Sequence, residues 1–402
     1  MREPVTPRVT WAAWALALSA FAGCIYLAHR GAVAEPMRDD SRTFLCAVRL
    51  ALSGGNPYDH AQLSSTCTAW THANPIVQPY FYPPPFLAFS AWTAVFPDYP
   101  SAQAAWTIVN ALTVLALAWR LSVWSGLSLP ACIGGTCAYY PTIFNQQVGN
   151  VNAALTIVLL EAVMRMSGSW LAIGVAAKIS PVVVLAAMVG RREGRALVAF
   201  ALTTAALVAT TVALYSRAPF EAFHADVWPV LASGTYPFDV PRLDGQLNHA
   251  FSRVLVLLGD DPSRTHLSPL ANGIRSALML GMSGLLAMRA RTEPTGGLGM
   301  LGVAGAFGCV MVLCAPLAWD THLMLVLPAL AFAFTALPPG RRAGLWIAGL
   351  SGVLALPFDW WQPVTYLFPD LAAPLGAMKM VAVFVLYCIC LVPRPAAALE
   401  PP

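Results

Sequence analysis

The chain has 402 residues, of which 58% are hydrophobic and only 10% charged, with a mean hydropathy of +0.64 and a formal net charge of +4. Soluble domains carry about 25% charged residues, so a water-soluble globule of this composition would expose large apolar patches and is excluded. The small positive charge is dispersed along the chain, which argues against a nucleic-acid partner. The nine cysteines form no CxxC or histidine-rich pattern, so we expect no metal site and no cofactor.

Twelve hydrophobic runs approach the length of about 20 residues that a helix needs to cross a bilayer. They cover residues 11–27, 84–96, 102–119, 127–143, 151–166, 170–189, 196–214, 272–288, 299–313, 323–337, 345–357 and 373–392. Glycine, proline or charged residues separate the runs. The pattern predicts an all-α, polytopic membrane protein with about 10–12 transmembrane helices, in which residues 1–402 form a single integral membrane domain.

The positions of the arginines predict the orientation, because cytoplasmic loops retain basic residues. If every run spans, one side of the membrane holds Arg2, Arg8, Arg191, Arg192, Arg195, Arg289, Arg291, Arg341, Arg342 and Arg394. This side is then the cytoplasm. Three longer polar segments, residues 28–82, 215–271 and 358–371, become outer loops.

Two arginines conflict with this count, because Arg120 and Arg165 then lie outside. An alternative topology removes the conflict if residues 84–96 do not span and residues 168–190 are a re-entrant pair of half-helices, broken near Pro181. This alternative also brings residues 146–152 to the outer face. We keep both topologies open at this point.

The first outer loop begins with an acidic pair, Asp39 and Asp40. Apolar residues at helical spacing follow the pair, and two glycines end the pattern, so we expect a short amphipathic helix on the membrane face. The carboxylates either cap this helix or include a general base at the boundary between water and lipid. Cys46 and Cys67 lie in the same loop, where oxidising conditions would permit a disulfide.

Polar residues recur at three further places. Lys178 interrupts an apolar stretch, where a cation needs an anion, a carbonyl or a water-filled cavity unless it extends to the membrane face. Arg253 closes a polar segment of the second outer loop and is either a phosphate ligand or a solvated arginine. Trp319 and His322 fit sugar stacking and phosphate or hydroxyl contacts, although tryptophan is also common in aromatic belts.

Short motifs follow one another from Asp40 to Pro328. They are Asp40-x-x-x-Phe44-x-x-Ala47, Gly55-Asn56-Pro57-Tyr58, Tyr82-Pro83-Pro84, Gln147-Val148-Gly149-Asn150-Val151-Asn152, Lys178-Ile179-Ser180-Pro181, Asp244-Gly245-Gln246-Leu247 with Arg253, and Pro316-x-x-Trp319-x-x-His322. In this order they resemble glycosyltransferase family 87. This family comprises membrane enzymes of the GT-C type and includes polyprenyl-phosphate-mannose-dependent mannosyltransferases.

The resemblance implies an inverting hexosyltransferase of the GT-C type, with mannose as the expected sugar. The donor would be a polyprenyl-phosphate sugar and the acceptor a lipid or glycan, at the outer face of a bacterial-type plasma (inner) membrane. Asp40 matches the aspartate base of these enzymes, and the neighbouring Asp39 is the alternative base. The expected substrate-binding residues are Asp39, Asn56, Tyr58, Tyr82, Lys178, Gln246, Asn248, Arg253, Trp319 and His322.

Two other functions fit the same hydropathy pattern. A multi-pass transporter or lipid flippase without glycosyl-transfer chemistry would explain the number of hydrophobic runs and the buried position of Lys178. The absence of an internal repeat in the sequence argues against transport. A scaffold subunit of an envelope-polymer machine would neither bind a donor nor transfer a sugar. Membrane lipids are partners in every case.

Overall fold

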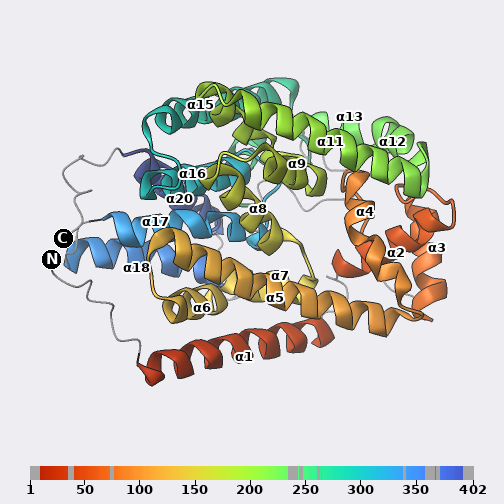
Figure 1. Cartoon of the computed structure of the whole chain (residues 1–402), viewed down its shortest axis with the longest axis horizontal. Coiled ribbons are helices and arrows are strands. Elements are labelled where there is room, and N and C mark those ends of the chain that lie inside the picture. Colours follow the sequence, from red (N-terminus) through yellow and green to blue (C-terminus); the bar gives the residue numbers. More distant parts are fainter. Residues whose placement is uncertain are drawn as a thin grey trace.

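A computed structural model describes residues 10–34, 40–72, 77–233, 243, 248–259, 263, 265–337, 341–357, 367 and 372–392 of the chain. Within these ranges the regular structure is helical and includes no strand (Figure 1). Helices cover all twelve hydrophobic runs, which confirms the predicted all-α fold class.

The first half of the chain alternates long helices with short ones. Its elements are α1 (Trp11–Ala34), α2 (Asp40–Leu52), α3 (His60–Thr71), α4 (Pro85–Ser90), η1 (Ala91–Val95), α5 (Tyr99–Ser125), α6 (Leu129–Ala138), α7 (Tyr140–Val148), α8 (Asn152–Met164), α9 (Gly168–Ala177), η2 (Ser180–Val184), α10 (Leu185–Gly190) and α11 (Gly194–Tyr215). The label η marks a short 3₁₀-helix or, for η3, a short π-helix.

The second half begins with short helices and continues with longer ones. Its elements are α12 (Ala218–Ala222), η3 (Phe223–Val227), α13 (Trp228–Ala232), α14 (Ser252–Leu255), η4 (Val256–Leu258), α15 (Pro269–Thr292), α16 (Leu298–Leu313), η5 (Asp320–Val326), α17 (Leu327–Ala336), α18 (Arg341–Ala355) and α20 (Ala372–Leu391).

Five of the described helices are long and apolar enough to cross a membrane, namely α1, α5, α11, α15 and α20. Helices α7 and α8 make a sixth candidate as a pair, although a bend of 119° separates them. The other hydrophobic runs form shorter apolar helices. The 10–12 predicted segments are therefore of two kinds: helices long enough to span the bilayer, and helices too short to cross it by themselves. The chain is a polytopic membrane protein, as predicted.

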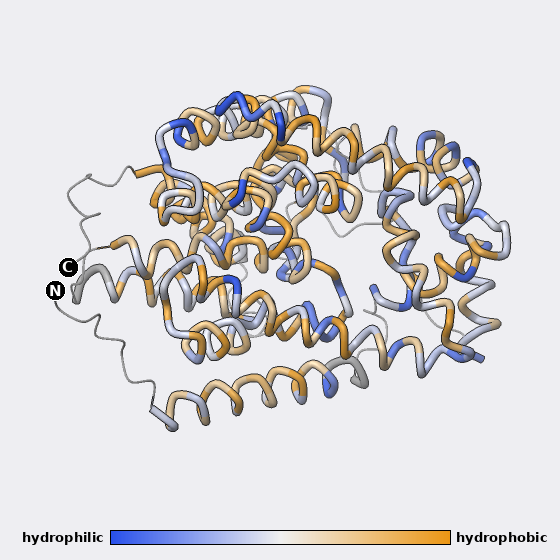
Figure 2. The backbone as a smooth tube through the Cα atoms, viewed as in Figure 1, coloured by the Kyte–Doolittle hydropathy of each residue, from blue (hydrophilic) through white to orange (hydrophobic). Residues whose placement is uncertain are grey.

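The outer helices present apolar surface that only lipid can cover. In α11 just 6% of the most apolar stretch is buried by the rest of the protein, and in α1 the figure is 17%. Figure 2 shows apolar residues along both helices, whereas hydrophilic residues gather around α2, α3 and α12. Such a distribution is stable in a bilayer and not in water.

Helix α16 is the centre of the main core, because every residue from Met300 to Leu313 is buried. Its glycines allow α17 and η5 to approach closely: a Cβ at Gly305 would lie 2.4 Å from Ala329 Cα, and one at Gly308 would lie 2.0 Å from the Leu325 carbonyl oxygen. Small residues at helix contacts are typical of packing inside membranes. This contact fixes η5, which carries part of the candidate site.

Two breaks in the helices expose polar residues. Helix α9 ends at Ala177 because Pro181 has no N–H to donate and its ring would collide with the Ala177 carbonyl. Lys178 follows in extended conformation, as the broken-helix alternative predicted. Helix α7 ends at Gly149, which has a φ of +66°, and α8 leaves in a new direction from Asn152.

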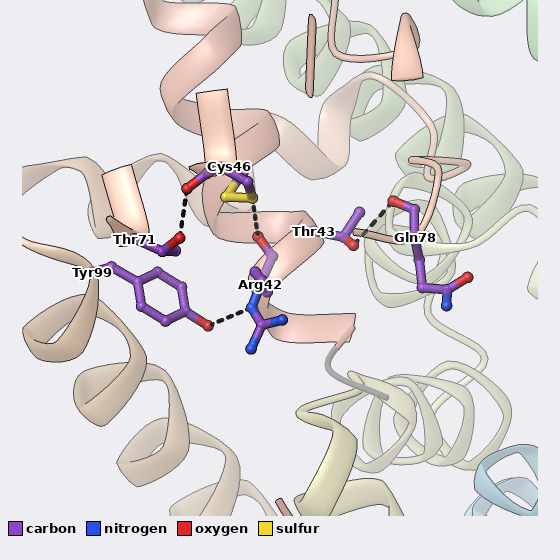
Figure 3. The surroundings of a disulfide bond; sticks show 7 residues. Arg42, Thr43, Cys46, Thr71, Gln78 and Tyr99 are labelled. Atoms are coloured by element: carbon purple, nitrogen blue, oxygen red, sulfur yellow. Dashed lines mark hydrogen bonds between the residues drawn. A yellow bond between two sulfur atoms is a disulfide. The ribbon is translucent and has the colours of Figure 1, made fainter. Parts of the chain in front are cut away.

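The predicted helix after the acidic pair is confirmed as α2, and the Cys46–Cys67 disulfide joins it to α3 with a Cα–Cα distance of 5.4 Å (Figure 3). Around the disulfide, Arg42 donates to the Tyr99 hydroxyl at 3.4 Å, and Thr43 donates to the Gln78 carbonyl at 3.1 Å. Most of α2 is buried, so it is packed between other segments instead of lying openly on the membrane face.

The arginines that conflicted with the simple topology gather at one end of the molecule. Arg120 and Arg165 both pair with Glu161, and the neighbouring Trp124 lies beside Gly296. Gly296 belongs to the turn that Arg191 also contacts, through hydrogen bonds to the Ala290 and Glu293 carbonyls and to Thr295. These arginines therefore share an end of the molecule.

Candidate active site

A cavity of about 470 Å³ lies where α2, the break after α9, η5, α15 and α16 meet. Five of the predicted site residues line it: Asp40, Tyr82, Lys178, Trp319 and His322. The rest of the lining is mainly apolar and includes Val182, Val183, Met279, Val310, Met311 and Leu325. Segments that lie far apart in the sequence thus bring their polar residues to one apolar hollow.

Asp40 is the first residue of α2, where the helix dipole favours a carboxylate. Its Oδ2 accepts a hydrogen bond of 2.7 Å from Asn150 Nδ2, and the same amide nitrogen donates to the Tyr82 hydroxyl at 3.3 Å. Asn150 is held in turn by Asn145, whose side chain donates to the Asn150 carbonyl at 2.9 Å. This contact therefore orients the carboxylate through a neutral donor.

Lys178 reaches the same group of residues from the break after α9. Its Nζ donates to Asn152 Oδ1 at 2.8 Å and lies 5.6 Å from the centre of the Tyr82 ring. Asn152 also donates to the Thr321 carbonyl at 3.0 Å, which ties the lysine to η5. The partly buried ammonium group therefore lies beside a ring and an amide, with donor capacity left for an anion.

Trp319 and His322 form the wall at the start of η5. His322 Nδ1 accepts a hydrogen bond of 3.1 Å from the Trp319 backbone N–H. A neutral imidazole with an accepting Nδ1 carries its proton on Nε2, so His322 can offer a donor to a ligand. The Trp319 indole N–H is buried and has no hydrogen-bond partner among the described residues. His322 can thus donate to a polar group of a substrate.

A buried ion cluster supports this wall from behind. Asp320 accepts from His249 Nε2 at 3.0 Å and pairs with Lys379 of α20. Asn248 accepts a hydrogen bond of 3.1 Å from the Ala318 backbone N–H and donates to the Leu243 carbonyl. The segment that carries Trp319 is therefore fixed by residues of two other parts of the chain.

Four predicted site residues do not line the cavity. Asn56 forms a turn with Tyr58, and Tyr58 donates to the Tyr82 carbonyl at 2.9 Å. Burial raises the pKa of Tyr58 well above its usual value, so the hydroxyl stays protonated and supports Tyr82 from outside. Asn248 has the structural role given above, and Arg253 is buried against Gly376 of α20. Asp39 and Gln246 lie outside the described residues.

Asn150 and Arg275, which line the cavity, and Asn152, which binds Lys178, were not among the predicted ligands. Asn150 and Asn152 belong to the motif Gln147-Val148-Gly149-Asn150-Val151-Asn152. Two amide side chains next to a glycine inside a hydrophobic region were the sequence signal that could have identified them as site residues. Arg275 lines the cavity from α15. In the sequence Arg275 stands out only as an arginine inside a hydrophobic run. Arginines that extend to the membrane face have the same pattern, so the sequence did not identify it as a site residue.

The fold and the site together define a polytopic membrane protein with a carboxylate, a lysine and a histidine around a largely apolar cavity. Residues 80–316, more than half of the chain, match glycosyltransferase family 87, and the chain belongs to this family. The matched region contains Tyr82, Asn150 and Lys178, whereas Asp40 and His322 lie on either side of it. No curated protein and no solved structure matches the chain. The protein is therefore a membrane glycosyltransferase.

Proposed function

We propose that this glycosyltransferase moves a hexose, with mannose as the expected sugar, from a polyprenyl-phosphate donor to a hydroxyl of a lipid or glycan acceptor. Asp40 acts as the general base, and the transfer inverts the configuration at the sugar. The observation that carries this proposal is the position of Asp40 in one largely apolar cavity with Lys178 and His322. Such a cavity suits a donor whose phosphate is polar and whose chain is hydrocarbon.

The reaction is a single displacement at the anomeric carbon. The acceptor oxygen forms the new bond to this carbon while its proton passes to the Asp40 carboxylate. The bond from the anomeric carbon to the phosphate oxygen breaks, and its electron pair leaves with the polyprenyl phosphate. Lys178 and the Nε2–H of His322 stabilise the negative charge that develops on this phosphate. One base is enough, because inversion needs no second carboxylate as a nucleophile.

Sugar recognition fits the remaining polar wall. Trp319 lines the cavity, and its buried indole N–H has no partner among the described residues. A hexose offers C–H groups that stack on an aromatic ring and hydroxyls that accept hydrogen bonds. We therefore place the transferred sugar between Asp40 and Trp319.

Two features support action at the outer face of a plasma (inner) membrane. The Cys46–Cys67 disulfide lies in α2 and α3, next to Asp40, and disulfides persist on the oxidising side of such membranes. The arginines Arg120, Arg165 and Arg191 share one end of the molecule, and cytoplasmic ends retain arginine. The site would then face away from the cytoplasm.

The test is a transfer assay with radiolabelled polyprenyl-phosphate mannose. Asp40→Asn keeps the size of the side chain and removes the base, so we expect the rate to fall by roughly 10²–10⁴-fold. Asp39→Asn is the matched control and should transfer sugar at close to the normal rate. Normal transfer by Asp40→Asn, with loss in Asp39→Asn, would assign the base to Asp39 instead.

The same assay addresses the transporter hypothesis. A transporter or flippase would move the labelled lipid between leaflets and leave the sugar on its phosphate. Consumption of the donor by the purified wild-type protein, with formation of a glycosylated acceptor, would be expected only of the enzyme. The family assignment favours this outcome.

A further inference from the structure

Arg275 lies two turns into α15 and lines the candidate site. Only 9% of its surface is exposed. Its guanidinium is held in place: Nε and Nη2 donate to Asn272 Oδ1 at 3.0 and 2.7 Å, and Nη1 donates to the Cys314 carbonyl at 2.8 Å. All these acceptors are neutral. The position of the charge is therefore fixed, but nothing in these contacts neutralises it.

Three other cations with little exposure each have a carboxylate partner. Arg120 pairs with Glu161, Lys379 with Asp320, and Arg289 with Glu293. Arg275 forms no salt bridge with any carboxylate in the part of the chain that the structure describes. A buried cation without a counter-charge is destabilising, so its presence at a cavity indicates that an anion compensates it when the site is occupied.

The geometry of the guanidinium suits a tetrahedral oxyanion. A guanidinium has five N–H groups, and three of those of Arg275 donate to other described residues, which leaves one N–H on each terminal nitrogen without a partner in the described part of the chain. Two N–H groups on neighbouring nitrogens form the fork that binds two oxygens of a phosphate. Because Asn272 and Cys314 already hold the group, little side-chain entropy is lost on binding.

The surroundings of Arg275 indicate which phosphate would bind. Met279, one helical turn further along α15, lines the same cavity, as do Val310 and Met311 of α16. The lining residues next to Arg275 on α15 and those contributed by α16 are thus apolar. A molecule that joins a phosphate directly to a long hydrocarbon chain matches this change from polar to apolar lining.

We propose that Arg275 binds the phosphate of the polyprenyl-phosphate donor and that the groove beside it, lined by Met279, Val310 and Met311, receives the start of the prenyl chain. This inference rests on the proposed function and deepens it. It replaces Arg253, which the sequence suggested as a phosphate ligand and which does not line the cavity.

The test measures binding without catalysis. The purified full-length protein in detergent is titrated with polyprenyl phosphate and with the uncharged polyprenol of the same chain length. For Arg275→Met we expect affinity for polyprenyl phosphate to fall roughly 10- to 100-fold, the usual effect of losing a charged hydrogen-bond pair. Affinity for polyprenol should not change. Arg275→Lys should keep part of the preference for the phosphate.

Arg217→Met is the matched control, because Arg217 is an exposed arginine before α12 that does not line the cavity. It should bind both ligands as the wild type does. Thermal unfolding checks that each variant is folded. If Arg275→Met does not fold, Arg275→Gln is used in its place. Inorganic phosphate and phosphatidylglycerol vesicles are added as competitors, and neither should displace polyprenyl phosphate at equal concentration.

The outcomes separate the two proposals. If Arg275→Met keeps the wild-type preference for the phosphate over the alcohol, the assignment of Arg275 is wrong while the proposed function stands. Displacement by phosphatidylglycerol or inorganic phosphate would also overturn it, because the site would then accept any phosphate. A wild-type protein that does not distinguish polyprenyl phosphate from polyprenol would instead contradict the proposed donor.

Discussion

Amide side chains, more than charged ones, organise the candidate site. Asn150 Nδ2 holds the Asp40 carboxylate and the Tyr82 hydroxyl, and Asn152 Oδ1 holds Lys178. A neutral amide can orient a base and a cation without neutralising either, since it carries no net charge.

This role of Asn150 makes a prediction about pH dependence. In Asn150→Asp a second carboxyl group replaces the amide that now lies 2.7 Å from Asp40 Oδ2. Two carboxyl groups at this distance share one proton, so the base becomes ionised only at higher pH. We expect the acid limb of the pH–rate profile for sugar transfer to move up by about one pH unit or more.

Asn150→Ala is the control, because it removes the same hydrogen bond without adding a charge. Its rate should fall, and its acid limb should move up less than that of Asn150→Asp, because the Ala variant loses a hydrogen bond to the ionised base but gains no second carboxyl group. Identical profiles for the Asp and Ala variants would show that Asn150 does not contact the catalytic base during turnover.

At the scale of the elements, interruptions of helices create the site. Gly149 ends α7 with a φ of +66°, and a Cβ there would lie 2.5 Å from Ser41 Cβ. Its carbonyl also accepts from Trp106 Nε1 at 2.8 Å. The turn therefore needs both the left-handed conformation and the missing side chain to bring Asn150 against the start of α2.

We expect Gly149→Ala to lower both stability and transfer. The left-handed conformation costs an alanine about 1 kcal/mol, and the contact with Ser41 in addition pushes α2 away from Asn150. Gly126→Ala is the matched control, because Gly126 has a φ of +75° but nothing within 4 Å of the added Cβ. Thermal unfolding should show a loss for both variants, and the transfer assay a loss for Gly149→Ala alone. Equal activities would contradict the proposed contact.

At the scale of the whole molecule, the cavity and the arginine-rich turns lie at opposite ends of the long apolar helices. Helix α11 connects them, from Gly194 beside Arg191 and Arg192 to Tyr215, whose hydroxyl donates to the Leu87 carbonyl of α4. Disulfide and cavity are together at the second end. If the long helices span the membrane as we propose, the two ends face opposite sides of it.

Single cysteines can test the assignment in intact cells. Ala61→Cys lies on the exposed side of α3, and Arg195→Cys lies at the start of α11. A maleimide that does not cross membranes should label Ala61→Cys at once and Arg195→Cys only after permeabilisation. The wild type sets the background, since its seven free cysteines are buried or, for Cys388, placed in the apolar α20. The reverse pattern of labelling would contradict an outer-face site.

Much of the fold could be predicted because bilayer physics leaves few options. The hydrophobic runs predicted the helices, and the acidic pair followed by helical spacing predicted α2. The length of single helices was harder to predict, since a proline or glycine divides a run without lowering its hydropathy. Pro181 and Gly149 are the two cases that matter for the site.

The sequence by itself determined that this protein is an all-α membrane glycosyltransferase of family 87, because a composition of 58% hydrophobic and 10% charged residues leaves lipid as the only stable solvent and because its motifs keep their order. Tertiary structure alone decided which polar residues meet. It joined Asp40 to Asn150 across 110 positions and brought Arg275 to the cavity, while Arg253 was packed against α20. Hydropathy fixes how deep a residue lies, but only the packing of helices fixes which way its side chain faces.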